Sequence, residues 1–430
     1  LLSLLQASGK RPAAFKCGPD YIDPMFHRRV IGVPSKNLDA FFTPPDTVRE
    51  LLAEGAENCN VALLEGVMGL YDGLGGVTEQ ASSYALAELT GTPIVLVVDA
   101  RGVGNSLLAL LDGFLAHDKS RLLRGVIFNR AKKSVYTLLA PLIEEKTGLR
   151  VFGYAPQYDG MRLESRHLGL VQPSELADIR ERIAGFGQTL RETLDIDGLL
   201  ALSGEAAELS FTPAALARLR VTGKGGAPRI GVARDEAFSF IYEDNLRLFQ
   251  KLGAEITEFS PLKDKRLPDA DGIYLCGGYP ELYAGELGEN RAFIASLRER
   301  LTGGCPSIAE CGGFMYLHET LTDGEGRTFP MAGALAGGVS FQGRLVRFGY
   351  VELSGRGFTL RGHEFHYYDG TNNGSDCTAA KPVTGKTYVC VHADGTKWWG
   401  FPHLYFYSAP EFASAFLRRA LRYREERNKG

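Results

Sequence analysis

The sequence lacks the features of membrane, nucleic-acid-binding and disulfide-stabilised proteins. No apolar run approaches the ~20 residues needed to span a bilayer, and no signal peptide is present. A net charge of −3 provides no basic surface for nucleic acid. The seven cysteines include no CxxC pair, which argues against a disulfide framework and a zinc site. We therefore expect a cytoplasmic protein with no nucleic-acid partner and no membrane partner.

Two further absences concern nucleotide binding and the start of the chain. The sequence contains no GxxxxGK[ST], the loop whose backbone amides hold nucleotide phosphates. It does not begin with Met, and it opens with a helix-like segment, 1–9, that ends in glycine. We expect that a segment upstream of Leu1 has been lost.

The first part of the chain alternates strand-like and helix-like segments, which predicts an α/β fold with a parallel sheet covered on both faces. The expected strands are 13–17, 61–64, 94–99, 125–129 and 151–154, and the expected helices are 47–56, 80–89, 106–117 and 135–146. The glycine-rich segment 222–228 is the best domain boundary. We predict two domains, 1–195 and 229–430, with a linker region at 196–228. A capping box at 408–411 predicts a final helix.

The most informative segment is 309–317, Ala-Glu-Cys-Gly-Gly-Phe-Met-Tyr-Leu. Cys311 stands where an apolar strand ends and a helix begins, so the sulfur is aimed at the N-terminus of that helix. Backbone N–H groups there lower the pKa of a thiol and can bind an oxyanion. The alternative is a buried, inert cysteine, which is common for an isolated Cys-Gly-Gly.

Two other strand ends favour the catalytic interpretation. Residues 274–281 form an apolar strand that ends in Gly277-Gly278, and His403 follows another apolar strand. These segments resemble the class I glutamine amidotransferases, which implies that Cys311 is the nucleophile and His403 its base. The resemblance also implies that Gly278 and Gly312 supply the oxyanion donors.

One position departs from that family. Many members carry a Glu two residues after the histidine to orient the imidazole, and here that position is Tyr405. Three alternatives stay open: a hydroxyl orients His403, a more distant carboxylate does so, or Cys311 and His403 act as a dyad. We therefore expect modest glutaminase activity.

Two clusters of polar residues follow strands in the first part. Segments 15–24 and 64–73 lie at strand C-terminal ends, where open α/β sheets bind ligands. Their carboxylates suit Mg²⁺ and the lysine suits a phosphate. The alternative is turn chemistry, since Gly, Pro and Asp are also turn formers. The charged members are Lys16, Asp20, Asp23, Glu65 and Asp72.

The whole chain resembles the cobyrinic acid a,c-diamide synthase family. The resemblance rests on Lys16-Cys-Gly-Pro-Asp-Tyr-Ile-Asp-Pro, Glu65-Gly-Val-Met-Gly-Leu-Tyr-Asp-Gly, Arg166-His-Leu-Gly-Leu, Gly277-Gly-Tyr-Pro-Glu, Ala309-Glu-Cys-Gly-Gly and Gly362-His-Glu-Phe-His-Tyr. It implies a P-loop NTPase-like parallel sheet, similar to dethiobiotin synthetase, with its first strand and P-loop missing here. A class I glutaminase-like α/β domain would follow that sheet.

The resemblance implies ATP-dependent amidation of the a and c carboxylates of cobyrinic acid, with glutamine as nitrogen donor and Mg²⁺ as cofactor. Hydrogenobyrinic acid or nickel sirohydrochlorin are alternative substrates. A non-catalytic tetrapyrrole-binding relative and a free-standing hydrolase are rival functions, and a homodimer is compatible with the sequence. By position, the resemblance assigns Asp20 and Glu65 to Mg²⁺, Lys16 and Asn129 to ATP, Tyr21 and Asp23 to the ring substrate, and Asp20 and Asp72 to catalysis.

For two of the candidate residues, Asn129 and His366, a purely structural role is an alternative to a functional one. Asn129 lies at a strand end, where its side chain would contact adenine or satisfy its own loop. His366 would line the substrate cleft, compete with His403 as the base, or serve as a hydrogen-bonded structural histidine.

Overall fold

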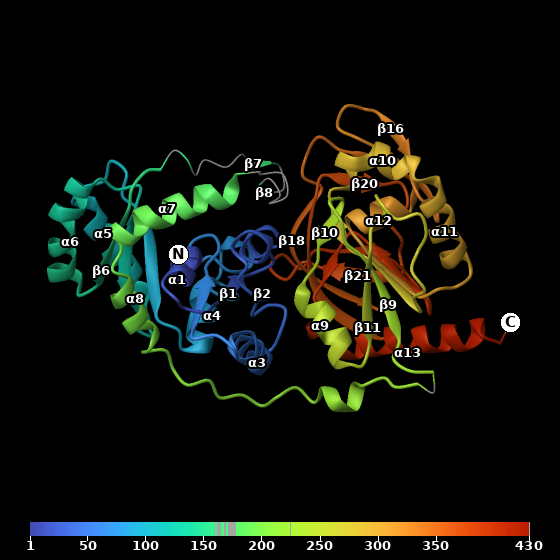
Figure 1. Cartoon of the computed structure of the whole chain (residues 1–430), viewed down its shortest axis with the longest axis horizontal. Coiled ribbons are helices and arrows are strands. Elements are labelled where there is room, and N and C mark those ends of the chain that lie inside the picture. The colour runs from blue at the N-terminus through green and yellow to red at the C-terminus, as the bar shows by residue number, and fades with distance from the viewer. Residues whose placement is uncertain (159, 161–164, 167–168, 171–177, 224, 430) are drawn as a thin grey trace. The chain divides into compact units, whose positions relative to one another are not determined.

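The chain forms two compact units in the computed structural model (Figure 1). The structure describes residues 1–158, 160, 165–166, 169–170, 178–223 and 225–429. Unit 1 comprises Leu1–Ala40 and Pro45–Pro213, and unit 2 comprises Phe41–Pro44 and Ala214–Gly430. No helix in the described part of the chain is both long and apolar enough to cross a membrane.

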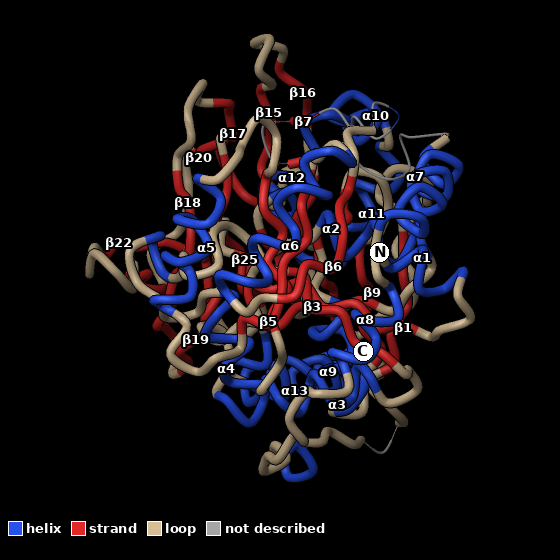
Figure 2. The backbone as a smooth tube through the Cα atoms, turned by 90° about the vertical axis from the view of Figure 1, so that its left-hand side faces the viewer, coloured by secondary structure: helices blue, strands red, loops and turns tan. Residues whose placement is uncertain are grey.

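Unit 1 contains two three-stranded parallel sheets, with the orders β2-β1-β3 and β4-β5-β6. Figure 2 shows strands of both sheets in red, among them β1, β3, β5 and β6. The prediction of an α/β fold with parallel strands is confirmed, and the sequence analysis missed only β2 among these six strands. Their bounds are β1 Pro12–Cys17, β2 Ser35–Leu38, β3 Val61–Glu65, β4 Ile94–Asp99, β5 Leu123–Asn129 and β6 Arg150–Ala155.

The helices of unit 1 cover these sheets with apolar side chains. Leu107 and Leu111 of α5 and Ile143 of α6 pack against Val126 and Phe128 of β5 in one buried cluster. Each regular helix of unit 1 has these bounds: α1 Leu2–Ala7, α2 Ile22–Met25, α3 Pro45–Ala56, α4 Ser83–Thr90, α5 Ser106–His117, α6 Lys133–Thr147, α7 Ile179–Thr193 and α8 Ile196–Ser203.

Helix α8 belongs to unit 1, although its residues lie in the range that we predicted as a linker. Leu202 of α8 is buried against Ile127 and Phe152, which lie on β5 and β6. The apolar face of this short helix is therefore part of the core of unit 1. From Ala214 onward the chain belongs to unit 2.

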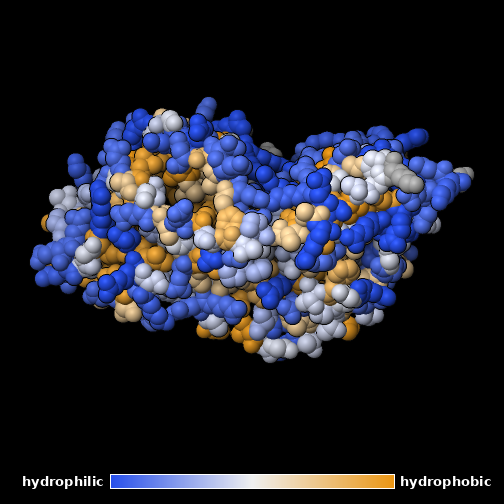
Figure 3. All heavy atoms as spheres, turned by 90° about the horizontal axis from the view of Figure 1, so that it is seen from below, coloured by the Kyte–Doolittle hydropathy of each residue, from blue (hydrophilic) through white to orange (hydrophobic). Residues whose placement is uncertain are grey.

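One edge of each sheet in unit 1 faces a cavity. Among the described strands, β3 pairs only with β1, and β4 pairs only with β5. Residues Val61–Glu65 of β3 and Ile94–Val97 of β4 line a cavity of about 930 Å³, and Figure 3 shows apolar residues around a hollow on this unit. Parallel strands are normally buried on both faces, yet Val97 is 60% exposed. Both sheets thus present an unpaired apolar edge.

Unit 2 is built on a six-stranded sheet with the order β11-β9-β12-β14-β24-β23. Its first five strands are parallel, and the short β23 is antiparallel to β24. The C-terminal ends of β12 and β14 carry the Gly277-Gly278 and Cys311 segments. The strand bounds are β9 Arg229–Ala233, β11 Glu255–Phe259, β12 Gly272–Leu275, β14 Ser307–Glu310, β23 His392–Ala393 and β24 Lys397–Gly400.

Unit 2 also contains a five-stranded antiparallel sheet, a four-stranded mixed sheet and an antiparallel pair of β10 (Phe238–Phe240) and β13 (Gly277–Gly278), none of which was predicted from the sequence. The orders of the two larger sheets are β22-β21-β18-β19-β25 and β16-β15-β17-β20. Strand β19 (Phe358–His366) pairs with β25 (His403–Leu404) and so positions His403. The remaining bounds are β15 His318–Thr322, β16 Thr328–Pro330, β17 Leu335–Phe341, β18 Arg347–Gly355, β20 Tyr368–Gly370, β21 Cys377–Ala380, β22 Thr387–Cys390, α9 Glu243–Lys251, α10 Ala284–Glu289, α11 Arg291–Thr302, α12 Gly312–Leu317 and α13 Pro410–Arg427.

The short segment Phe41–Pro44 belongs to unit 2, although the chain on both sides of it belongs to unit 1. Phe42 is fully buried and stacks on Tyr405 with ring centroids 5.1 Å apart. Phe41 packs on Tyr350 with ring centroids 4.6 Å apart. These aromatic contacts make the segment part of the core of unit 2.

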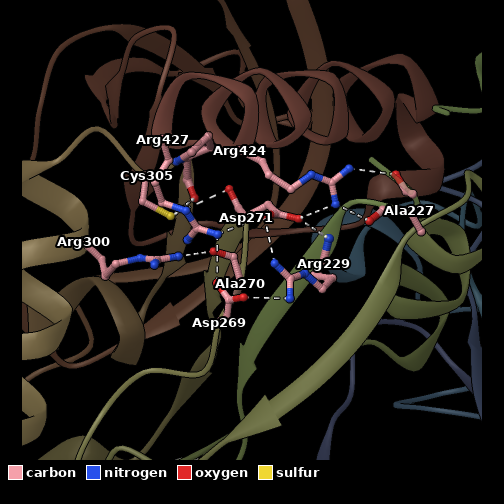
Figure 4. A network of polar contacts seen from close by, with 11 residues as sticks. Ala227, Arg229, Asp269, Ala270, Asp271, Arg300, Cys305, Arg424 and Arg427 are labelled. Carbon is pink, nitrogen blue, oxygen red and sulfur yellow. Dashed lines mark hydrogen bonds and ion pairs between the residues drawn. The ribbon is translucent and has the colours of Figure 1, made fainter. Parts of the chain in front are cut away.

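A buried charge network joins the start of the central sheet to the C-terminal helix of unit 2 (Figure 4). Asp271 is fully buried, and its Oδ2 accepts from the backbone N–H of Arg229 at 2.9 Å and pairs with Nη1 of Arg424 at 3.3 Å. Arg424 also donates to the carbonyls of Gly226 and Ala227. Asp269 accepts from Arg229 and Arg427 at the solvent side. Asp271 is therefore the charge that compensates the buried end of Arg424.

Replacing Asp271 is expected to destabilise unit 2. Asp271→Asn keeps the size of the side chain but leaves Arg424 without its buried counter-charge, which costs about 3 kcal/mol. Asp269→Asn is the matched control, because its exposed pairs are worth less than about 1 kcal/mol. Urea unfolding followed by tryptophan fluorescence reports on this unit, since both tryptophans, Trp398 and Trp399, lie on β24. Equal midpoints for the two variants would contradict the prediction.

Candidate active site

Cys311 lies at a sharp turn between β14 and α12, as the sequence analysis predicted. Its backbone has φ 45° and ψ −108°, which is unusual for a residue other than glycine. Such conformations cost about 1–3 kcal/mol and persist only where the surroundings hold them. The N–H of Cys311 donates to the carbonyl of Gly400 at 2.9 Å, and its own carbonyl accepts from Met315 at 2.8 Å. The turn has the geometry of a nucleophile elbow.

The predicted oxyanion glycines lie beside this turn. A Cβ atom on Gly312 would lie 3.0 Å from the amide nitrogen of Gly278 and 2.8 Å from Cδ of Pro280. A Cβ atom on Gly277 would clash with the imidazole of His403. The structure thus brings the glycine loop, the cysteine turn and His403 together, and a side chain on Gly277 or Gly312 would not fit where they meet.

The resting site holds its two reactive groups in their neutral forms. Burial raises the pKa of Cys311 well above its usual range, the Glu281 carboxylate raises it further, and the N–H of Gly312 only partly offsets both effects. Burial likewise lowers the pKa of His403. The N–H of Gly312 at the helix N-terminus does lower the thiol pKa, as expected, but desolvation by burial outweighs it and the net pKa is raised.

The contacts around His403 bear on which group orients its imidazole, since Tyr405 stands where many relatives have a Glu. The hydroxyl of Tyr405 donates to Asp244 at 3.1 Å, so it is directed to that carboxylate. His363 stacks on His403 with ring centroids 5.0 Å apart. His366 stacks on Phe401 at 4.1 Å, and its Nδ1 lies 2.7 Å from the carbonyl oxygen of Tyr368, which fits a structural histidine.

A second polar cluster lies at the C-terminal ends of β1 and β3 in unit 1. Nζ of Lys16 lies 2.5 Å from Asp23 and 3.2 Å from Glu65. His27, which the sequence analysis missed, places Nε2 3.1 Å from Glu65 and Nδ1 3.0 Å from the hydroxyl of Ser35. Burial opposes the charged form of Glu65, but His27 and Lys16 outweigh it and lower the pKa of the carboxyl. The structure thus joins two sequence clusters into one charged site.

Asp20 and Tyr21 lie at the start of α2 in the same region. Oδ1 of Asp20 accepts from the N–H groups of Ile22 and Asp23 at 2.8 and 3.1 Å. Burial raises the pKa of Asp20, and the neighbouring Asp23 raises it further. Tyr21 is buried, with 7% of its surface exposed. Asp20 therefore has a local structural role in addition to the metal role that the sequence predicted.

The side chains of two predicted residues have hydrogen bonds to near neighbours in the chain. Oδ2 of Asp72 accepts from the N–H of Gly69 at 3.0 Å. Asn129 ends β5, and its side chain accepts from the N–H of Arg130 at 3.0 Å, as in the local alternative. In the predicted segment 166–170, residues 167 and 168 lie outside the described residues.

No group of three or more His, Cys, Asp or Glu side chains in the described residues is arranged to hold a metal ion. Instead, the Lys16 ammonium lies between Asp23 and Glu65. Mg²⁺ is usually held by one or two carboxylates together with phosphates, so Asp20 and Glu65 still fit that mode of binding. The Mg²⁺ assignment stays a prediction.

Comparison with known proteins places these sites in a family. Residues 229–402 match the family model described as a CobB/CobQ-like glutamine amidotransferase domain. The cobyrinate a,c-diamide synthase of Salmonella typhimurium is 39% identical over 436 residues, which cover 98% of this chain and 94% of that protein. The chain belongs to the cobyrinate a,c-diamide synthase family. It is accordingly an enzyme, a glutamine-hydrolysing ligase, as the sequence analysis predicted.

Other members of the family are similarly close. The cobyrinate a,c-diamide synthase of Thermoplasma acidophilum is 38% identical to this chain, and the match covers 97% of this chain and 94% of the Thermoplasma protein. The cobyrinate a,c-diamide synthase of Listeria innocua is 36% identical to this chain, and the match covers 95% of this chain and 93% of the Listeria protein. The similarity therefore spans both units.

A side chain at Gly312 is expected to block glutamine hydrolysis. In Gly312→Ala the added methyl group would lie against the amide of Gly278, so an oxyanion could no longer approach both N–H groups. Loss of one oxyanion donor lowers kcat by about 10²–10³-fold. Gly395→Ala is the control, because a Cβ there meets nothing within 4 Å. Ammonia release from glutamine measures the effect, and a Gly312→Ala enzyme with the kcat of the control would contradict the assignment.

Proposed function

We propose that this protein amidates carboxylates of a corrin-type tetrapyrrole, with glutamine as the nitrogen donor and ATP as the activating co-substrate. The observation that carries the proposal is the buried Cys311 turn beside the Gly277-Gly278 loop and His403. The relatives named above are cobyrinate a,c-diamide synthases. Cobyrinic acid, amidated at its a and c carboxylates in cobalamin biosynthesis, is therefore the proposed substrate.

The first half-reaction takes place in unit 2. His403 accepts the Sγ proton of Cys311, and the sulfur attacks the side-chain carbonyl carbon of glutamine. The N–H groups of Gly278 and Gly312 stabilise the oxyanion. His403 then returns the proton to the departing nitrogen, and ammonia leaves behind a thioester that water hydrolyses. Since both groups start neutral, the proton transfer creates the thiolate only when the substrate is attacked.

The second half-reaction is assigned to unit 1. A carboxylate oxygen of the ring attacks the γ-phosphate of ATP and displaces ADP, and ammonia then attacks the carbonyl carbon of the resulting acyl phosphate and displaces phosphate. Lys16 would bind a phosphate, and Asp23, Tyr21 and Asp72 would contact the ring carboxylates. When bound, Mg²⁺ would neutralise phosphate charge beside Asp20 and Glu65. Asn129 would contact the adenine.

The cavity of unit 1 supports a P-loop NTPase-like sheet in this unit. The unpaired edges of β3 and β4 are both parallel edges, and the cavity between them is lined mostly by apolar residues. One more parallel strand paired to both edges would join the two sheets into one. Such a strand would place its C-terminal end near Lys16 and Glu65, where a phosphate-binding loop is needed.

A non-catalytic tetrapyrrole-binding protein is the rival function. The residues at both sites argue against it, because a binder needs neither a strained nucleophile turn nor a buried Lys16 between two carboxylates. Hydrogenobyrinic acid and nickel sirohydrochlorin remain alternative ring substrates.

Mass spectrometry of the ring product tests the proposal. The full-length gene product is incubated with MgATP, glutamine and, in separate samples, each of the three rings. We expect two successive amidations of cobyrinic acid. Cys311→Ala should lose this activity with glutamine and recover it with free ammonia. Release of ammonia without amidation of any ring would contradict the tetrapyrrole assignment.

The two half-reactions should separate in a variant of unit 1. Lys16→Met is expected to lower ATP-dependent amidation by about 10²-fold, since it removes a buried phosphate-binding cation, while glutamine hydrolysis continues. Lys119→Met is the control, because that side chain is 75% exposed. Amidation with ammonia and hydrolysis of glutamine are measured in parallel. Unchanged amidation in Lys16→Met would place phosphate binding elsewhere.

A further inference from the structure

Glu310, the residue before Cys311, is a buried carboxylate whose position no other function explains. Its side chain is 1% exposed, and no Lys or Arg among the described residues forms an ion pair with it. Burying a carboxylate without a cation is costly. Carboxyl groups of this kind occur preferentially at functional sites. Glu310 does not stand out in the sequence, because it forms part of the Ala-Glu-Cys-Gly-Gly motif around Cys311.

Two hydrogen bonds fix the Glu310 carboxylate against His403. Oε1 accepts from the N–H of Leu404 at 3.2 Å, and Oε2 accepts from the hydroxyl of Tyr274 at 2.9 Å. Oε2 also lies 3.9 Å from Nδ1 of His403. The donors come from β25 and β12, on either side of the carboxylate. Glu310 therefore lies on the Nδ1 side of the His403 ring.

We propose that Glu310 orients His403 and so takes the role that other class I glutamine amidotransferases give to the residue two places after the histidine. This inference rests on the proposed glutaminase reaction. Glu310 is a positioning residue, because it acts through His403 and does not touch the substrate. The separation of 3.9 Å is longer than a hydrogen bond, and such contacts are often long in unliganded enzymes and tighten in the substrate complex.

The proton balance gives Glu310 a defined task. With Nδ1–H directed at Oε2, the other nitrogen, Nε2, carries the lone pair that accepts the Sγ proton of Cys311. His403 then becomes an imidazolium, and the Glu310 carboxylate stabilises that charge without taking the proton. When His403 returns the Nε2 proton to the leaving ammonia, the imidazole is neutral again. The carboxylate thus keeps one tautomer throughout the cycle.

The other polar groups near His403 have well-defined contacts of their own. The hydroxyl of Tyr405 donates to Asp244, and Nδ1 of His363 lies 3.1 Å from the hydroxyl of Tyr242. Burial lowers the pKa of His363 to about 3, so this ring packs on His403 as a neutral group. The carboxylate of Glu364 contacts Lys381 at 3.1 Å and Tyr388. Among the described residues, Glu310 is the carboxylate with an oxygen 3.9 Å from Nδ1 of His403, and the Glu364 carboxylate acts on the pKa of His403 as a further charge.

Glu310 also predicts a pH dependence. Burial raises the pKa of this carboxyl to about 8, and the donors Tyr274 and Leu404 offset the effect only in part. The titratable groups around it are Tyr274 and Cys276 from the β12 side, His403 on β25, and Cys311. The orienting charge is present above the pKa of Glu310 and is lost as the pH falls through it. Glutamine hydrolysis should therefore rise between pH 7 and 9.

The test compares Glu310→Gln and Glu310→Asp in the full-length protein, with kcat and KM for glutamine hydrolysis measured from pH 6 to 9.5. Replacing the orienting carboxylate of a triad by its amide lowers kcat by up to about 10⁴-fold through the wrong tautomer. We expect Glu310→Gln to lose at least about 10²-fold in kcat with little change in KM, and to lose the rise near pH 8. Glu310→Asp should recover part of kcat and the pH dependence.

The controls separate positioning from folding and from failure of the proposed function. The fluorescence of Trp398 and Trp399 should be unchanged in Glu310→Gln, which shows that unit 2 is folded, and unchanged amidation with free ammonia shows the same for unit 1. Asp271→Asn removes another buried carboxylate of unit 2 and should keep the pH profile. If Cys311→Ala abolishes hydrolysis while Glu310→Gln keeps the kcat and pH profile of the natural protein, the inference is wrong although the function stands. Should Glu310→Gln not fold, a Glu310→Asp enzyme with an unchanged kcat and a flat pH profile also overturns it.

Discussion

The backbone conformation of Cys311 is the constraint on which the active site of unit 2 depends. A positive φ at this residue turns the chain from β14 into α12 within one position, and the hydrogen bonds to Gly400 and from Met315 hold it there. The same turn places Gly312 against Gly278. The strain is thus balanced by the pairing of β14 with β24, and Cys311 and the two glycines proposed as oxyanion donors share one scaffold.

Burial sets the chemistry that this scaffold can perform. The environment that excludes water around Cys311 and His403 also removes the solvent that would stabilise a thiolate–imidazolium pair, so both residues rest in neutral forms. A neutral thiol is protected from oxidation and from chance electrophiles. In that state, reactivity depends on groups that favour the charged pair during the reaction, such as the glycine amides and a carboxylate behind the imidazole.

Much of this architecture could be predicted from local sequence. The apolar strand before Cys311, the glycines after it and the alternating segments of unit 1 each carry their signal within about ten residues. Features that depend on distant partners could not. The capping box at Ser408 is not formed, because its hydroxyl donates to Tyr405 instead and α13 begins at Pro410 without a side-chain cap. The raised thiol pKa, the role of His27 and the position of Glu310 likewise arise from packing between segments far apart in sequence.

The segment Phe41–Pro44 makes the sequence of unit 1 discontinuous, because it belongs to unit 2. Because Phe42 fills the core of unit 2 against Tyr405 while its neighbours on both sides build unit 1, the boundary between the units is crossed more than once. A single contiguous stretch of the gene therefore does not encode all of unit 2, and exchanging only the C-terminal stretch would leave Phe41–Pro44 behind. A foreign first unit would have to bring a compatible aromatic pair at the right place, or leave a hole beside Tyr405 and Tyr350.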